Sequence, residues 1–255
     1  MKKNFKKLWK WHWMSFPLKQ IKTVTKMKNW IIGFVLVGMS ITASAGDFVA
    51  NVGYFNEIRV LGNYKVFLQK GDVQKVEVKN NAPEIIDEKI SCEVKDSTLT
   101  VRIKGDTYKE RAIEVYITYT SLNWLTAKNG CIAEVMTTMT QDKVNFNVES
   151  GGKIKAKIDC KQVEAEIDAG GSIHLEGIVD DAMYKVSAGG TIGVVSLDAR
   201  KVVAQITAGG EIILRVKEDL SIKILSGGNV SYIGKPEAYE QSITLGGKIS
   251  KLKDQ

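Results

Sequence analysis

The chain has 255 residues and a formal net charge of +7, but its excess of positive charge lies entirely near the N-terminus. Residues 1–45 hold nine lysines and no acidic residue, which leaves 27 basic and 29 acidic residues in the other 210. That remainder is close to −2 and lacks the basic surface that nucleic acids attract, so no nucleic-acid partner is expected. Its length suits one large domain or two small ones.

Residues 27–45 have the three parts of a secretory signal peptide: Met27-Lys28, the apolar run 30–41, and Ala43-Ser44-Ala45. Cleavage there would leave Gly46 as the mature N-terminus. The apolar run is shorter than the roughly 20 residues of a transmembrane helix, so the mature chain is expected to have no membrane-spanning segment. We therefore predict export to the periplasm, the cell surface or the medium.

The upstream segment, residues 1–26, has two interpretations. Either translation starts at Met27 rather than Met1, or the segment is a basic extension that contacts acidic lipid before export through Trp11 and Trp13. In both cases residues 1–45 are predicted to be a leader outside the working fold.

Residues 46–125 are rich in predicted strands. Polar and apolar residues alternate, as in half-buried strands, over residues 55–60, 64–68, 73–78, 99–103 and 113–117. Residues 82–87 could add one helical turn. This part is expected to form irregular first coils, or a small sheet that covers the end of the larger structure that follows.

Residues 126–255 contain one short phrase, a small or apolar residue followed by Gly-Gly, six times. The copies occupy residues 150–154, 169–173, 188–192, 208–212, 226–230 and 245–249. Their first glycines are 18–20 residues apart, which is the signature of a solenoid. Residues 126–132 resemble a degenerate earlier copy, because Gly130 lies 21 residues before Gly151.

The residues around each Gly-Gly pair favour strands over helices. β-Branched or aliphatic residues stand three positions before and three positions after every first glycine, with polar residues alternating between. Glycine accepts φ > 0, so each pair is predicted to turn the chain between two strands, with looser corners at segments such as 179–181 and 217–219. The predicted fold is all-β: a right-handed parallel β-helix (solenoid) of about 19-residue Gly-Gly repeats with a strand-rich N-terminal cap.

Several of these segments, in this order, carry a family resemblance. They are Phe55–Val60, Val66–Gly71, the strand 96–103 and the Ser/Ala-Gly-Gly ladder that ends in residues 230–236. Over residues 55–252 the chain resembles the bacterial family described as "putative auto-transporter adhesin, head GIN domain". The resemblance implies a secreted or surface β-helical domain and transfers no catalytic residue.

The sequence offers little for catalysis or metal binding. Glu149 and Asp168, one repeat apart, are the acids beside the corners that could form a glycosidase-like pair, but their column continues as serine, threonine and leucine. No acidic ligand recurs at each repeat, as calcium-binding β-rolls require, and His174 is the one histidine after the leader. We therefore predict no catalytic, cofactor-binding or metal-binding residues.

Three cysteines, Cys92, Cys131 and Cys160, are an odd number with wide spacing. This pattern matches neither a disulfide framework nor a zinc site. One pair could form a disulfide, although buried free thiols in strands fit the pattern better.

Aromatic residues gather in the first half of the mature chain. They are Tyr54, Tyr64, Tyr108, Tyr116, Tyr119 and Trp124. Such rings serve either as core residues or as ligand-binding surfaces. The favoured function is a non-catalytic, adhesin-like binding module for a carbohydrate or a cell-surface protein. The alternatives are a polysaccharide-active enzyme and a structural envelope protein that forms homo-oligomers.

Overall fold

The computed structural model describes residues 47–81, 90–104 and 112–254. The predicted leader (1–45) and the predicted helical turn (82–87) lie outside these ranges. Within them no helix is long and apolar enough to cross a membrane. The strands are β1 (Asp47–Asn51), β2 (Glu57–Leu61), β3 (Lys65–Lys70), β4 (Lys75–Asn80), β5 (Ile90–Lys95), β6 (Thr98–Ile103), β7 (Ile113–Tyr119), β8 (Trp124–Lys128), β9 (Ile132–Val135), β10 (Lys143–Glu149), β11 (Lys153–Ala169), β12 (Ser172–Ala188), β13 (Thr191–Ala208), β14 (Glu211–Ser226), β15 (Asn229–Ile233), β16 (Ala238–Leu245) and β17 (Lys248–Lys251).

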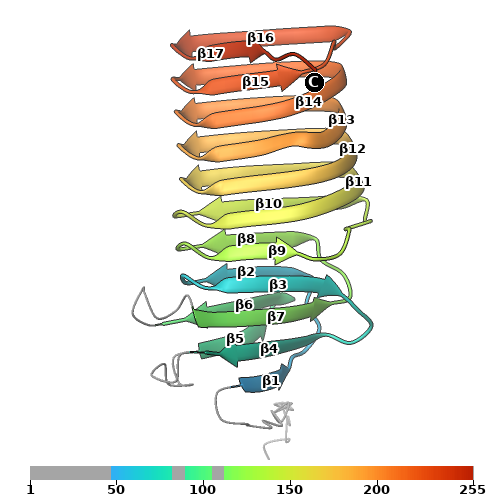
Figure 1. The fold of residues 1–255 in the computed structure, drawn as a ribbon, viewed down its shortest axis with the longest axis vertical. Helices are drawn as coiled ribbons and strands as arrows, with labels where there is room; N and C mark the ends of the chain where they lie inside the picture. The colour runs from blue at the N-terminus through green and yellow to red at the C-terminus, as the bar shows by residue number, and fades with distance from the viewer. Residues whose placement is uncertain (1–46, 82–89, 105–111, 255) are drawn as a thin grey trace, which may run out of the picture. The chain divides into compact units, whose positions relative to one another are not determined.

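The strands stack into two layers, which we call sheet I and sheet II (Figure 1). Sheet I contains β5, β6, β2, β8, β10, the second halves of β11 to β14, and β16. Sheet II contains β1, β4, β7, β3, β9, the first halves of β11 to β14, β15 and β17. Each coil gives one strand to each sheet, and neighbours from β6 and β7 onward are parallel. The predicted parallel β-solenoid is confirmed.

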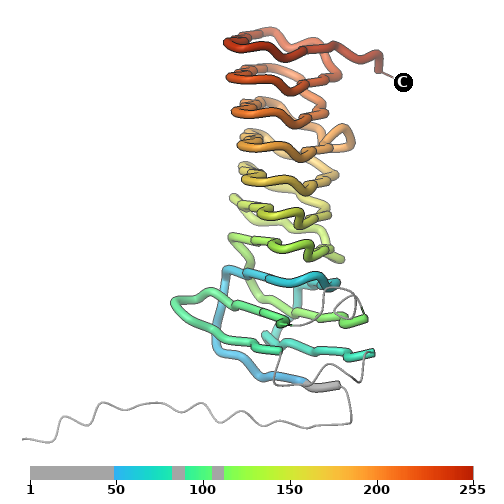
Figure 2. The backbone as a smooth tube through the Cα atoms, turned by 90° about the vertical axis from the view of Figure 1, so that its left-hand side faces the viewer, coloured from blue at the N-terminus to red at the C-terminus, as the bar shows by residue number. Residues whose placement is uncertain are grey.

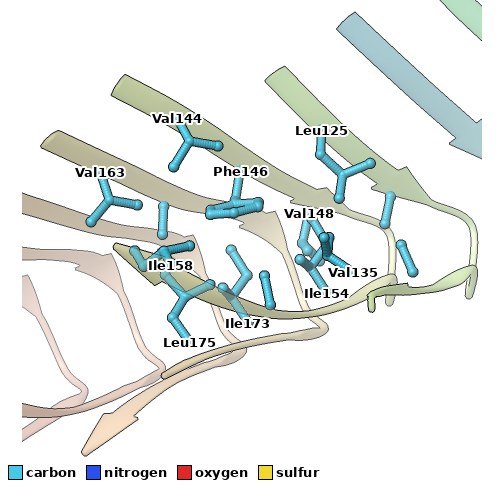
Figure 3. Packing of buried hydrophobic residues seen from close by; sticks show 14 of the residues in the cluster. Leu125, Val135, Val144, Phe146, Val148, Ile154, Ile158, Val163, Ile173 and Leu175 are labelled. Atoms are coloured by element: carbon cyan, nitrogen blue, oxygen red, sulfur yellow. The ribbon is translucent and has the colours of Figure 1, made fainter. Parts of the chain in front are cut away.

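Aliphatic ladders fill the space between the two sheets. The column three positions after each first glycine pairs in register through five successive coils and is at most 1% exposed; its members are Ile154, Ile173, Ile192, Ile212 and Val230. Figure 3 shows Ile154 and Ile173 with Phe146 and Val163 of the same buried cluster. Because successive side chains of a strand point to opposite faces, the alternation seen in the sequence becomes this apolar interior.

The Gly-Gly corners stack directly on one another. In the corner of residues 169–172, Gly170 and Gly171 have φ of 63° and 106°. The amide of Ser172 donates a hydrogen bond to the carbonyl of Gly152 in the preceding coil, at 3.0 Å. The same bond joins Thr191 to Gly171. A side chain on the second glycine would stand in the path of this contact, which explains why the position recurs as glycine.

The opposite corners differ from the loops that the sequence predicted. The chain bends at Val179–Asp181 without leaving the ladder, since Val179 pairs with Cys160 and Asp181 pairs with Gln162. The reason is that in-register stacking keeps the backbone groups of a corner hydrogen-bonded to the adjacent coils. The register shifts in these coils lie between His174 and Gly177 where β12 pairs with β13, and between Val194 and Asp198 and between Ala199 and Lys201 where β13 pairs with β14.

The N-terminal strands join the same stack out of chain order. The β2–β3 coil lies between the β6–β7 coil and the β8–β9 coil (Figure 2). Beyond β6 and β7, the antiparallel strands β5, β4 and β1 cover this end of the two sheets. Antiparallel strands interrupt the repeating parallel edge, and so act as the cap that the sequence predicted for a solenoid end.

The last coil, β16 and β17, is more exposed to solvent than the coils before it. Ile243 is 43% exposed, whereas Ile224, its register partner in β14, is fully buried. Gln241 lies two residues before Ile243 on the same face of β16, and it pairs in register with Ile222 of β14. The amide side chain makes this open end partly polar.

The three cysteines are free thiols: Cys131 and Cys160 are buried and Cys92 is half-buried. Burial disfavours the thiolate and raises the pKa of Cys92 and of Cys160 to about 11, and it also raises the pKa of Cys131. The disulfide that the sequence left open is absent.

These thiols predict alkaline destabilisation. The unfolded chain loses thiol protons near pH 9, whereas the folded chain retains them, so the free energy of unfolding should fall as pH rises from 9 to 11. The loss is at most about 1.4 kcal/mol per pH unit for each thiol. Urea unfolding at pH 8, 9.5 and 10.5 measures it, with Cys92→Ala as the matched control that should flatten the slope. A slope that this variant leaves unchanged would contradict the explanation.

Candidate functional site

The outer face of sheet I is the more enclosed one in β11, but not along the whole stack. In β11 the outward residues of sheet I (164, 166 and 168) are half-buried and those of sheet II (153, 155 and 157) are exposed. In β14 the order is reversed: residues 211, 213 and 215 of sheet II are half-buried, whereas residues 223 and 225 of sheet I are exposed. Three grooves within the described ranges open on sheet I or at the corner beside it. We name them the Trp124 groove, the Arg102 groove and the corner groove.

The Trp124 groove, of about 310 Å³, crosses β6, β2, β8 and β10. Trp124 is 39% exposed, and its Nε1 donates a hydrogen bond to the Oγ1 of Thr126 at 3.2 Å. The indole therefore leans along β8 towards Thr126, which pairs with Arg59 on one side and Asn147 on the other. The groove is lined further by Glu57, Thr98 and Glu149.

The Arg102 groove, of about 440 Å³, continues from the Trp124 groove, because Arg59 and Glu149 line both. Its other charged residues are Glu93 and Lys95 of β5, Arg102 of β6 and Lys128 of β8. The two grooves form one polar trough around a single exposed indole.

The predicted acid pair, Glu149 and Asp168, lies on sheet I with both carboxylates engaged. Lys128 forms an ion pair with Glu149, and Asn147 donates from Nδ2 to Asp168 at 3.1 Å. Glycoside hydrolysis needs one carboxyl poised as acid and another poised as base or nucleophile. A lysine and an amide that hold the two groups give no support to that arrangement. That neither residue is catalytic stays a prediction.

The charged neighbours of this pair form a network on the same face. Burial, together with nearby Asp168, raises the pKa of Glu166. A hydrogen bond to Glu164 raises the pKa of Lys185. Three carboxylates, those of Glu164, Glu166 and Asp168, stand here against the ammonium of Lys185, so this part of sheet I is net acidic.

The corner groove, of about 610 Å³, runs across β10 to β16 where sheet I begins. Its lining alternates charged residues, such as Asp181, Lys201 and Asp219, with the apolar side chains Met183 and Val203. Six stacked strands about 4.8 Å apart give it a length of roughly 24 Å.

The predicted aromatic group divides by position. Tyr64 and Tyr119 are 1% exposed and belong to the core, and Tyr116 stacks on Phe67 with ring centroids 5.1 Å apart. Tyr54 and Trp124 are exposed, and Trp124 alone of the described members lines a groove on sheet I. Tyr108 lies outside the described residues.

The predicted absence of a metal site concerns His174 and the acidic residues. His174 is exposed on sheet II beside Gly193, as its alternating position predicted. Over the described ranges, no three or more His, Cys, Asp or Glu side chains are grouped to hold a metal ion.

The family model described as "putative auto-transporter adhesin, head GIN domain" matches residues 54–236. The chain belongs to this family. No curated protein matches it. The resemblance seen in the sequence is thus confirmed over most of the part that follows the predicted leader.

Solved structures share the head GIN fold. A crystal structure from Bacteroides fragilis described as a putative adhesin has TM-score 0.71 and 21% identity, covering 81% of this chain and 96% of its own. A putative lipid binding protein from Parabacteroides distasonis has TM-score 0.63 and 19% identity, with the same coverage. A putative adhesin from Parabacteroides merdae has TM-score 0.63 and 17% identity, covering 81% and 95%. At these identities the likeness concerns the fold.

In this head GIN chain, sequence reasoning missed two arginines that line the grooves, Arg59 and Arg102. Each occupies an outward position of an alternating strand, which is a weak signal by itself. The decisive fact is that β6, β2 and β8 are adjacent, and this order does not follow the chain.

Proposed function

We propose that this chain is an exported, non-catalytic binding module of the adhesin type, which holds an extended carbohydrate along the outer face of sheet I. The observation that carries the proposal is that three grooves open on or beside this one face. A rigid stack of parallel strands presents such a platform at little entropic cost on binding. The signal-peptide pattern of residues 27–45 and the family description support export.

A glycan array tests this function on the purified protein, with an assay for released reducing ends on every glycan bound. Binding without release is the expected result. Release of sugar ends that Glu149→Ala abolishes would instead establish the polysaccharide-active enzyme. Binding of a surface protein but of no glycan would contradict the proposal that the ligand is a carbohydrate.

Paired substitutions test which face binds. Ser187→Tyr places a bulky ring on the outer face of sheet I, and Lys157→Tyr places the same ring on sheet II. We expect the first to weaken glycan binding about tenfold and the second to leave it unchanged. Equal effects of the two substitutions on glycan binding would contradict the proposal that sheet I is the binding face.

Lipid binding is a second candidate because Met183 and Val203, register partners on β12 and β13, place two adjacent apolar side chains in the corner groove. One structure of the same fold is described as a putative lipid binding protein. Displacement of a fluorescent fatty acid by unlabelled fatty acid measures this binding. Val203→Glu should abolish it and leave glycan binding intact, whereas unchanged displacement would exclude the corner groove.

A further inference from the structure

We propose that the Trp124 and Arg102 grooves together form a site for an acidic saccharide, in which a hexuronate ring stacks on Trp124 and its carboxylate pairs with Arg59. This inference rests on the proposed carbohydrate-binding function and names the class of sugar. Three features of these grooves support it: the indole ring of Trp124, the charge of the lining residues and an unpaired amide oxygen.

The indole of Trp124 supplies the surface for the ring. It is the large aromatic group that lines these grooves, and its Nε1–H is already bonded to Thr126. Trp124 follows Asn123 at the start of β8 and lies between Glu57 and Asn145 in the register. With the polar edge of the indole satisfied by Thr126, its apolar surface is what remains for a ligand, which suits the C–H face of a sugar.

The charge of the trough favours an anion. Four basic residues line it, Arg59, Lys95, Arg102 and Lys128, against three acidic ones, Glu57, Glu93 and Glu149.

Two of those three acidic groups are already engaged. Lys128 pairs with Glu149, and Thr98 donates a hydrogen bond to Glu57 at 3.0 Å. The side chains of Arg59 and Arg102 are exposed, and their guanidinium groups form no ion pair or hydrogen bond with the rest of the described chain.

Two free guanidinium groups therefore stand on adjacent strands. Arg59 pairs with Thr100 in register and Arg102 with Leu61, so the arginines are diagonal neighbours on β2 and β6. Guanidinium binds carboxylate through two parallel hydrogen bonds, which fixes orientation as well as charge. Because Arg59 lines both grooves, it is placed to bind a carboxylate carried by a ring on Trp124.

A buried amide oxygen supplies the third element. The Oδ1 of Asn147, a residue that lines the Trp124 groove, is buried and has no hydrogen-bond partner among the described residues. Asn147 is 9% exposed, and its Nδ2 is committed to Asp168, so the Oδ1 is the end that remains without a partner. An unpaired buried acceptor is costly, and a donor that reaches it recovers that cost. Sugar hydroxyls are such donors.

Calorimetric titration tests the site with four probes: mixed hexuronate oligosaccharides, the same oligosaccharides after reduction of the carboxyl groups, neutral hexose oligosaccharides, and a glutamate oligopeptide. The wild-type protein should bind the hexuronates at least tenfold more tightly than the reduced form, and it should not bind the peptide. Arg59→Gln should abolish this preference, and Trp124→Ala should weaken both saccharides about tenfold. Lys157→Gln, an equal charge change on sheet II, should change neither.

The outcomes separate the two proposals. Equal affinity for acidic and reduced saccharides, with Arg59→Gln silent, overturns the acidic site and leaves carbohydrate binding in place. Peptide binding as tight as saccharide binding also overturns it, because charge alone would then suffice. No binding of any saccharide, together with an empty glycan array, overturns both. A melting temperature within about 2 °C of wild type confirms that each variant is folded.

Discussion

Tyr184→Phe is expected to stabilise the protein by about 1 kcal/mol, whereas Tyr184→Ala is expected to destabilise it by about 3–5 kcal/mol. Tyr184 is fully buried in the interior of the solenoid, and its hydroxyl has no hydrogen-bond partner among the described residues. Burial raises the pKa of this hydroxyl, and a neutral phenol without a partner still bears the desolvation cost of its O–H. Removing the oxygen recovers that cost while the ring stays.

The ring itself fills a space that the adjacent coils leave open. In register, Tyr184 lies between Ala165 and Ala204, and Phe146 lies on the far side of Ala165. Large and small side chains thus alternate along this column, and each ring extends over the alanine beside it. Truncating Tyr184 would place three alanines in succession and leave a cavity that stiff neighbouring coils cannot close.

Urea unfolding of both variants measures these effects, and Tyr64→Phe is the matched control. Tyr64 is equally buried, but its hydroxyl donates to the carbonyl of Val101 at 2.8 Å. Its removal should therefore cost about 1 kcal/mol, opposite in sign to Tyr184→Phe. If Tyr184→Phe proved as destabilising as the control, the Tyr184 hydroxyl would have to bind a buried water.

The sequence predicts the repeating part of this fold, but it does not predict the order of the N-terminal strands. The 19-residue period and the alternation around each Gly-Gly pair predicted which residues face inward from β10 onward, because every coil repeats the same geometry. Nothing periodic predicted that the β2–β3 coil lies between β6–β7 and β8–β9. The alternating strands before residue 120 are locally equivalent, so their order depends on long-range packing.

The candidate site follows the same division. The sequence grouped Trp124 with Tyr64 and Tyr119 as aromatic residues of either the core or a ligand-binding surface, and the structure buries the two tyrosines. Whether a ring is buried or exposed depends on the face of the strand on which it lies. Which face is interior is known only once the neighbouring strands are known. The arginines became part of a site only through the adjacency of β6, β2 and β8.

Gly171→Ala is expected to destabilise the protein by about 3 kcal/mol or more, and Gly170→Ala by about 1–2 kcal/mol. Both glycines have positive φ in one corner. A Cβ on Gly170 would meet nothing within 4 Å, so its cost is the left-handed backbone alone. A Cβ on Gly171 would lie 2.3 Å from the carbonyl oxygen of Gly152, the acceptor for Ser172.

The alanine at position 171 must therefore push one coil away from the next or break the hydrogen bond that joins their corners. Because the following corner repeats the contact through Thr191 and Gly171, the displacement would extend along the stack. Urea unfolding of the two variants measures the difference between them. Part of it comes from the backbone, because φ of 106° at Gly171 lies outside the left-handed well that holds Gly170 at 63°, and the rest is the steric cost of the close approach. Equal destabilisation would mean that backbone conformation alone, and not the close approach of coils, requires the Gly-Gly phrase.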